Sequence, residues 1–122
     1  MSYVPLNQLD VYQISCEYSD EGWKIYESLP QTIQFHIGSQ MIDSVDSVGA
    51  NIAEDYGRFH FLDKIRFYYT ARGSLFESKH WLDLLFKRKF IANEKYQELM
   101  ILYKRIQICL NILINSVYRS KK

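Results

Sequence analysis

The chain has 122 residues, of which 48% are hydrophobic and 24% charged, and its formal net charge is +1. This length predicts one domain over residues 1–122, and five glycines and two prolines are too few for a sandwich or barrel with many turns. Cys16 and Cys109 lack metal or redox spacing, and neither a leader nor a long apolar span is evident, so we expect a cytoplasmic protein without membrane contact.

Apolar side chains recur every three or four residues along four stretches of the chain. The pattern predicts helices at about residues 7–28, 31–56, 61–88 and 93–119. Pro30 separates the first two, and Gly57 is expected to end the second in a left-handed conformation. Short connections make successive helices antiparallel. The sequence therefore predicts an all-α, antiparallel up-down-up-down four-helix bundle with crossing angles of about 20°.

Two glycines interrupt the middle of the second and third predicted helices. A glycine there costs about 1 kcal/mol relative to alanine, which calls for a packing reason. Folding these two helices back on each other near residue 60 sets Gly49 close to Gly73. We therefore interpret both as helix-contact glycines that let the two backbones approach closely.

Polar residues cluster around the same positions. The antiparallel alignment brings Glu54 near Arg66, and Arg58 lies one turn after Glu54 on its own helix. Facing polar groups on two helices form either a catalytic site or a buried network that fixes helix register, and we favour the network. Its predicted members are Asn51, Glu54, Arg58, Arg66, Arg72, Ser74 and Glu77.

Patterns typical of enzymes and metalloproteins are missing from the sequence. Glu54 and Asp55 are adjacent carboxylates, but neighbouring residues on a helix diverge by about 100° and do not face one substrate. His36, His60 and His80 lack the spacing of metal ligands. We expect no catalytic residues, no cofactor, no metal and no small-molecule substrate, so the protein is predicted not to be an enzyme.

Charge is divided between the two halves of the chain. Residues 1–63 contain ten acids and two bases, whereas residues 64–122 contain four acids and thirteen bases. An acidic and a basic flank suit head-to-tail packing of identical subunits into a ring. The basic half, interleaved with aromatic residues, also suggests nucleic-acid binding. The candidate contacts are Lys64, Arg66, Arg72, Lys79, Lys87, Arg88, Lys89, Lys104 and Arg105.

Two segments carry a family resemblance: residues 50–58 (ANIAEDYGR) and residues 71–77 (ARGSLFE). They resemble motifs of the four-helix-bundle proteins encoded in intervening sequences of bacterial 23S ribosomal RNA genes, the S23 ribosomal protein-like family. The resemblance spans nearly the whole chain and implies a bundle without an agreed activity, similar to bundles that assemble as pentameric rings. The chain departs from the family at Asp55, where glycine is usual, and at Gly49, which replaces an expected proline.

The resemblance also bears on partners. A related group of bundles serves as accessory factors to reverse transcriptases, where a basic ring surface engages RNA and the enzyme. We therefore expect a non-enzymatic, ring-forming homo-oligomer, a pentamer, that associates with RNA or a ribonucleoprotein. The alternative is a purely structural homo-oligomeric adaptor that binds another protein, such as a reverse transcriptase, because the acidic half repels polyanions.

Overall fold

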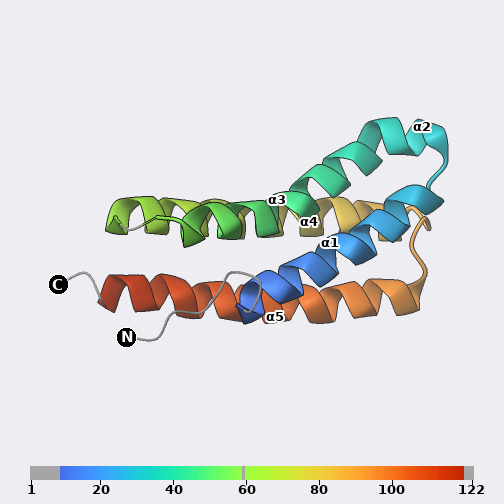
Figure 1. Cartoon of the computed structure of the whole chain (residues 1–122). Coiled ribbons are helices and arrows are strands. Elements are labelled where there is room, and N and C mark those ends of the chain that lie inside the picture. The colour runs from blue at the N-terminus through green and yellow to red at the C-terminus, as the bar shows by residue number, and fades with distance from the viewer. Residues whose placement is uncertain (1–8, 59, 120–122) are drawn as a thin grey trace.

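Four helical rods pack side by side in the computed structural model, which describes residues 9–58 and 60–119 (Figure 1). In chain order they are α1 (Asp10–Ser28), a kinked rod made of α2 (Gln31–Ile33), η2 (Gln34–Gly38) and α3 (Ser39–Tyr56), then α4 (Phe61–Lys87) and α5 (Asn93–Arg119). Both α1 and α4 pack against α3 and α5. The predicted antiparallel four-helix bundle is confirmed. The predicted start of the first helix, at residue 7, lies outside the described residues.

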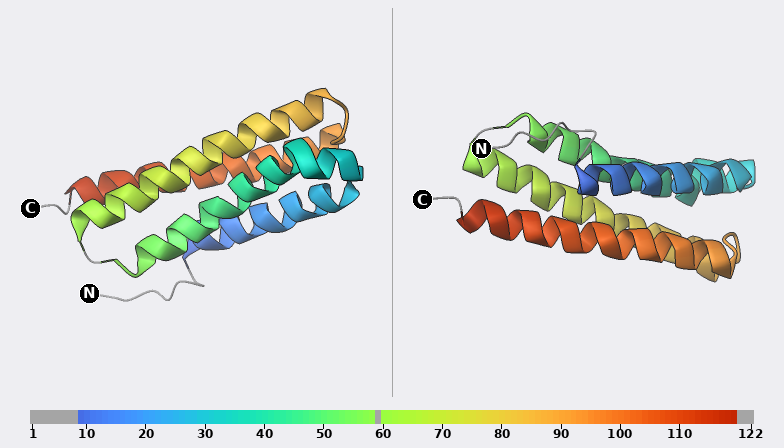
Figure 2. Two further views of the ribbon diagram at one scale, coloured as in Figure 1. Left: turned by 90° about the horizontal axis from the view of Figure 1, so that it is seen from above. Right: turned by 60° about the horizontal axis from the view of Figure 1, so that its bottom comes forward.

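The rods form two layers, with α1 and α3 in one and α4 and α5 in the other (Figure 2). This pairing follows the division of charge along the chain. For example, α1 carries five acids and one base, whereas α4 carries three acids and five bases. The bundle therefore has an acidic layer and a basic layer.

Pro30 lies in the connection between α1 and α2 and separates the two helices. Leu29 is extended, with ψ of 146°, as expected for a residue before proline. The carbonyl of Pro30 then accepts hydrogen bonds from the backbone N–H groups of Ile33 and Gln34, both at 2.9 Å, and so begins the next helix. Leu29 is buried, which ties this turn to the core.

The second rod is kinked in its first turns. Segment η2 is a π-helix, and within it His36 has non-helical backbone angles, with φ −118° and ψ −107°. A Cβ on Gly38 would lie only 2.8 Å from the carbonyl oxygen of Ile33, so a larger residue there forces the backbone to shift. Gly38 therefore permits the tight approach of the two turns at the kink.

The helix ends differ from the prediction at Gly57. This residue has φ −85°, and none of the described glycines has a positive φ, so the predicted left-handed end of the second helix is wrong. The left-handed residue is instead Lys89, with φ 69°, just after α4. Phe90 N–H donates to the Leu85 carbonyl and Lys89 N–H to the Phe86 carbonyl, the bond pattern of a Schellman motif.

The core is apolar and continuous along the bundle axis. Its fully buried side chains include Met41, Val45, Leu75, Leu82, Leu99, Ile106 and Leu110. One buried hydrogen bond, 2.7 Å long, joins the hydroxyl groups of Tyr18 on α1 and Ser78 on α4. It satisfies two polar groups that would otherwise be costly to bury, and it links opposite corners of the bundle.

Candidate functional site

The two glycines predicted to touch each other do not. A Cβ on Gly49 would contact the Cβ of Ser15 on α1 at 3.5 Å, and a Cβ on Gly22 would contact Val45 at 3.0 Å. The close approach of small residues thus lies between α1 and α3. Gly73 is exposed, and a Cβ there would meet no atom within 4 Å. The predicted role of Gly73 as a contact between the second and third helices is therefore wrong, because its face of α4 points outward.

The predicted buried polar network is also wrong, because its members make separate local contacts. Glu54 pairs with Arg58 at 2.9 Å, but these side chains are 56% and 42% exposed. Asn51 donates to the carbonyl of Ser47, and Glu77 accepts from the Trp81 ring nitrogen. Arg66 lies over the ring of Phe67, Ser74 is half-buried, and Arg72 donates to Asn111 on α5 at 3.0 Å. Most of these side chains lie on outward faces of α3 and α4.

The candidate nucleic-acid contacts divide into two groups. Three are engaged by the bundle: Lys64 lies 3.9 Å from Asp55, Arg72 donates to Asn111, and Lys79 pairs with Asp83 at 2.7 Å. The others are exposed. These six are Arg66 on α4, the group Lys87, Arg88 and Lys89 at the end of α4, and the pair Lys104 and Arg105 midway along α5.

One face of α4 is exposed along most of its length and is partly apolar. Leu62 is 74% exposed, Phe76 47% and Tyr69 39%. The three- and four-residue spacing of these side chains places them in one row with Gly73 near its middle. We call this row the α4 stripe, and its residues are Leu62, Arg66, Tyr69, Gly73, Phe76 and His80.

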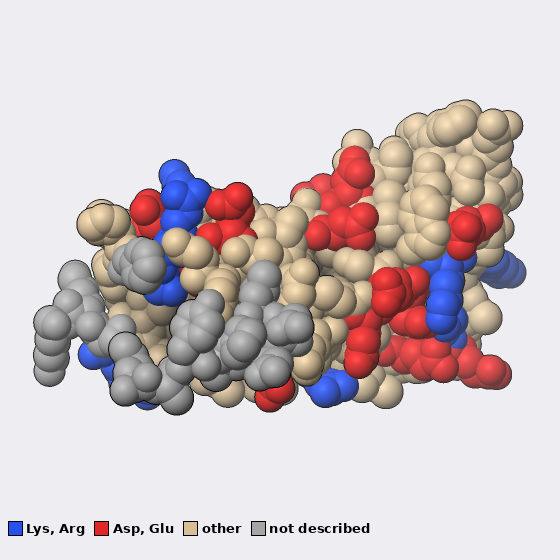
Figure 3. Space-filling model, in the orientation of Figure 1, with Lys and Arg blue, Asp and Glu red and all other residues tan. Residues whose placement is uncertain are grey.

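A groove between α1 and α5 forms a second, different surface. It is hollowed to about 770 Å³ near Trp23 and Ile101, and four α1 carboxylates line this part. A smaller hollow of about 300 Å³ continues it to Ile108. Ile101 and Ile108 are more than half exposed. Acidic side chains gather between α1 and α5 on the right of the visible face (Figure 3). We call this surface the α1–α5 groove.

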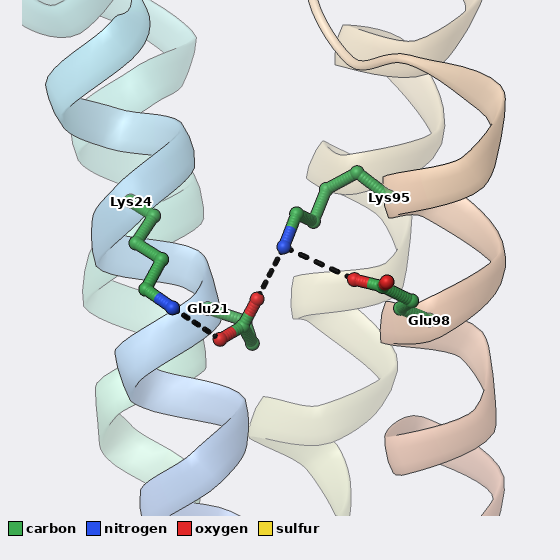
Figure 4. Close-up of polar contacts among 4 residues, drawn as sticks. All are labelled: Glu21, Lys24, Lys95 and Glu98. Carbon is green, nitrogen blue, oxygen red and sulfur yellow. Dashed lines mark hydrogen bonds and ion pairs between the residues drawn. The ribbon is translucent and has the colours of Figure 1, made fainter.

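An ion-pair cluster fixes the two walls of the groove against each other. Glu21 on α1 accepts hydrogen bonds from Lys95 on α5 and from Lys24 one turn further along α1, and Lys95 also pairs with Glu98 (Figure 4). Lys95 first, and Lys24 second, lower the pKa of the Glu21 carboxyl. The pKa of Lys95 is raised by Glu21 and then by Glu98. Both shifts favour the charged pair.

Asp55 is the main polar group that the sequence-based reasoning missed. Its side chain is 1% exposed, and neither carboxylate oxygen makes a well-formed hydrogen bond within the described part of the chain. Burial raises the pKa of the Asp55 carboxyl, against the lowering effects of the neighbouring Tyr68 hydroxyl and Lys64 ammonium. Burial and Asp55 in turn raise the pKa of Tyr68. The available signal was an acid on the inward face of the predicted helix, three residues after the apolar Ile52.

Within residues 9–58 and 60–119, no three or more His, Cys, Asp or Glu side chains are grouped so that they could hold a metal ion. Cys16 and Cys109 are free thiols. None of the helices described combines the length and the apolar character that a bilayer crossing requires.

Two comparisons with known proteins find matches. The model of the 23S rRNA-intervening sequence protein family matches residues 7–112. A crystal structure of a protein of unknown function from the S23 ribosomal protein family of Bacteroides thetaiotaomicron superposes with a TM-score of 0.80. The two chains are 26% identical, and the match covers 86% of this chain and 95% of that one. No curated protein matches the sequence.

Proposed function

Because the chain belongs to the 23S rRNA-intervening sequence protein family, we propose that it is a non-enzymatic bundle whose identical subunits close into a ring, a pentamer, that binds RNA or a ribonucleoprotein. The observation that carries this proposal is the presence of two unlike apolar surfaces on one subunit, the α4 stripe and the α1–α5 groove. A contact between unlike surfaces is head-to-tail, and it generates a closed ring when the rotation between subunits closes.

The two surfaces complement each other in shape and charge. The α4 stripe is a convex helix face with exposed Phe76 and Tyr69, aromatic residues of the kind enriched at interfaces. Arg66 lies on this stripe. The α1–α5 groove is hollow, carries exposed isoleucines and is lined by acidic side chains of α1, with Lys24 and Arg105 as the basic residues of its lining. Basic and aromatic groups of one subunit therefore meet acidic and apolar groups of the next.

The proposed ring explains why a glycine occupies position 73 in the middle of α4. Inside the subunit it costs helix stability, and a Cβ there would meet no atom within 4 Å. At the centre of the stripe, the missing side chain lets the backbone of α4 settle closely onto a neighbouring subunit. The packing role that the sequence suggests for Gly73 is thus moved from the intrasubunit contact to the subunit interface.

Substitution of Gly73 tests the ring contact separately from folding. We expect the Gly73→Leu subunit to stay folded by circular dichroism, because the site is open within the subunit, yet to lose assembly in sedimentation velocity because the added side chain blocks close approach. The matched control is Gln40→Leu, which adds a leucine to an exposed position of α3, outside both surfaces. Unchanged assembly of the Gly73→Leu protein contradicts the interface.

The RNA part of the proposal is supported by exposed bases that a ring repeats in every subunit. Lys87, Arg88 and Lys89 cluster at the end of α4. Repetition of this cluster around a ring gives a polyanion several equivalent contacts. The acidic layer of each subunit then faces away from the RNA.

Salt dependence tests this part. Fluorescence anisotropy of a labelled RNA oligonucleotide is expected to show affinity that falls steeply with salt, with a slope reduced by about one for each phosphate contact removed. Lys87→Gln with Arg88→Gln is the test pair, and Arg58→Gln, at the end of the acidic α3 and outside both proposed contact surfaces, is the control. If no RNA binds even at low salt, the partner is a protein, and the adaptor alternative replaces this part of the proposal.

A further inference from the structure

A mainly apolar hollow lies where the start of α1 meets the end of α3, apart from the α4 stripe and the larger hollow of the α1–α5 groove. Its volume is about 380 Å³, within the range of about 300–1,000 Å³ typical of small-molecule sites. All four rods contribute to its wall, among them Val11 from α1, Ile52 from α3, Tyr68 from α4 and Leu113 from α5. Its rim includes Ile112, which is 58% exposed.

The wall of this hollow contains the orphaned carboxylate. Asp55 lines the hollow together with Tyr68, and both are buried. The nearest described cation, Lys64 Nζ, is 3.9 Å from Oδ2, which is beyond hydrogen-bonding distance. The Tyr68 hydroxyl is a neighbour of the carboxyl, but neither carboxyl oxygen accepts a well-formed hydrogen bond from it. A buried carboxylate without well-formed hydrogen bonds is costly, so a ligand that supplies N–H donors gains both charge and hydrogen-bond energy there.

We infer that this hollow is a binding site for a small amphipathic amine, with its ammonium group on Asp55 and its apolar body against Ile52, Val11 and Leu113. This site goes beyond the proposed ring and its RNA surface, and it requires neither. An anion is repelled by Asp55, and a neutral apolar molecule leaves the carboxylate unpaired. A primary amine with an apolar body satisfies both parts of the wall, because it places donors at one end only.

The first experiment compares two ligands of the same shape on the full chain. By isothermal titration calorimetry at pH 7, phenethylamine is expected to bind at least tenfold more tightly than 2-phenylethanol, which has the same apolar body but no positive charge. Asp55→Asn is expected to remove this preference while the bundle still folds. Equal affinity for the two ligands, or an undiminished preference in Asp55→Asn, overturns the site.

The second experiment locates the bound amine through Cys109, a half-buried free thiol that lines both this hollow and the smaller hollow of the α1–α5 groove. In a Cys16→Ser background, saturating phenethylamine is expected to slow alkylation of Cys109 by iodoacetamide at least severalfold, and 2-phenylethanol at equal concentration to slow it less. Asp55→Asn distinguishes the two hollows, because it is expected to remove the protection only if the amine lies in this one. If bound phenethylamine leaves the alkylation rate unchanged, the amine binds elsewhere and the inference fails.

Discussion

Asp55→Asn tests the cost of the buried carboxylate directly. In the folded chain this group is 1% exposed, and neither oxygen has a well-formed hydrogen bond to a described residue. An unpaired buried ion costs several kcal/mol, whereas the buried amide that replaces it still costs about 1–3 kcal/mol if it finds no partner. We therefore expect Asp55→Asn to raise the free energy of unfolding at pH 7 by about 1–2 kcal/mol.

The stability difference between Asp55→Asn and the wild type is expected to change with pH in one direction. The pKa of Asp55 in the folded chain is raised above its ordinary value of 3.8, so the folded state holds the proton more tightly than the unfolded chain. The stability from this group is fully present below the unfolded pKa and is lost as pH rises through the folded pKa. Asp55→Asn removes this loss, so its advantage over the wild type grows from pH 3.5 to pH 7.

Urea unfolding followed by circular dichroism, at several pH values, measures both effects. Asp43→Asn, an exposed acid on the same helix, is the matched control and is expected to change stability by less than about 0.5 kcal/mol. If Asp55→Asn is less stable than the wild type at pH 7, then Lys64 and Tyr68 do compensate the charge, and our reading of the site is refuted.

Other substitutions test separate parts of the fold. Glu21→Gln is expected to lower the free energy of unfolding by about 1 kcal/mol at pH 7 and by almost nothing well below pH 4. The pKa of the Glu21 carboxyl is lowered in the folded chain, so the stability that this group contributes is lost as pH falls through that pKa. Urea unfolding at both pH values measures the difference. Lys89→Gly is expected to raise stability by about 0.5–1 kcal/mol, since φ is 69° there, and an unchanged unfolding midpoint argues against the strained helix end. Gly38→Ala is expected to cost about 1–3 kcal/mol because the added Cβ meets the Ile33 carbonyl. In the unassembled subunit, at low protein concentration, Gly73→Ala is expected to gain about 1 kcal/mol, and thermal melts of the two variants that shift the same way there contradict the geometry.

The sequence predicts the helices and their order because helical periodicity and proline are local signals. The third and fourth rods, α4 and α5, lie almost where the apolar pattern places them. Pro30 ends the first helix through its own steric effect on Leu29. The kink at His36 was not predicted, because the surrounding apolar spacing continues through it and only Gly38 reflects the contact with Ile33.

The side-chain partners are harder to predict because they depend on helix rotation. An alignment by residue number pairs positions along two antiparallel helices but does not say which face of each helix is turned inward. The alignment pairs Gly73 with Gly49, yet Gly73 faces outward, and Gly49 faces Ser15 on α1. The sequence shows Asp55 as a neighbour of Glu54 and as a departure from the family motif, but the residues that surround it come from all four rods, which no local pattern brings together.

The molar mass of the assembled protein in solution tests the central claim most directly. Light scattering coupled to gel filtration is expected to give about five times the subunit mass of 14.6 kDa, and to give the same mass over a tenfold range of protein concentration, as a closed ring requires. A mass of one subunit at all concentrations, or a mass that grows without limit as concentration rises, contradicts the ring.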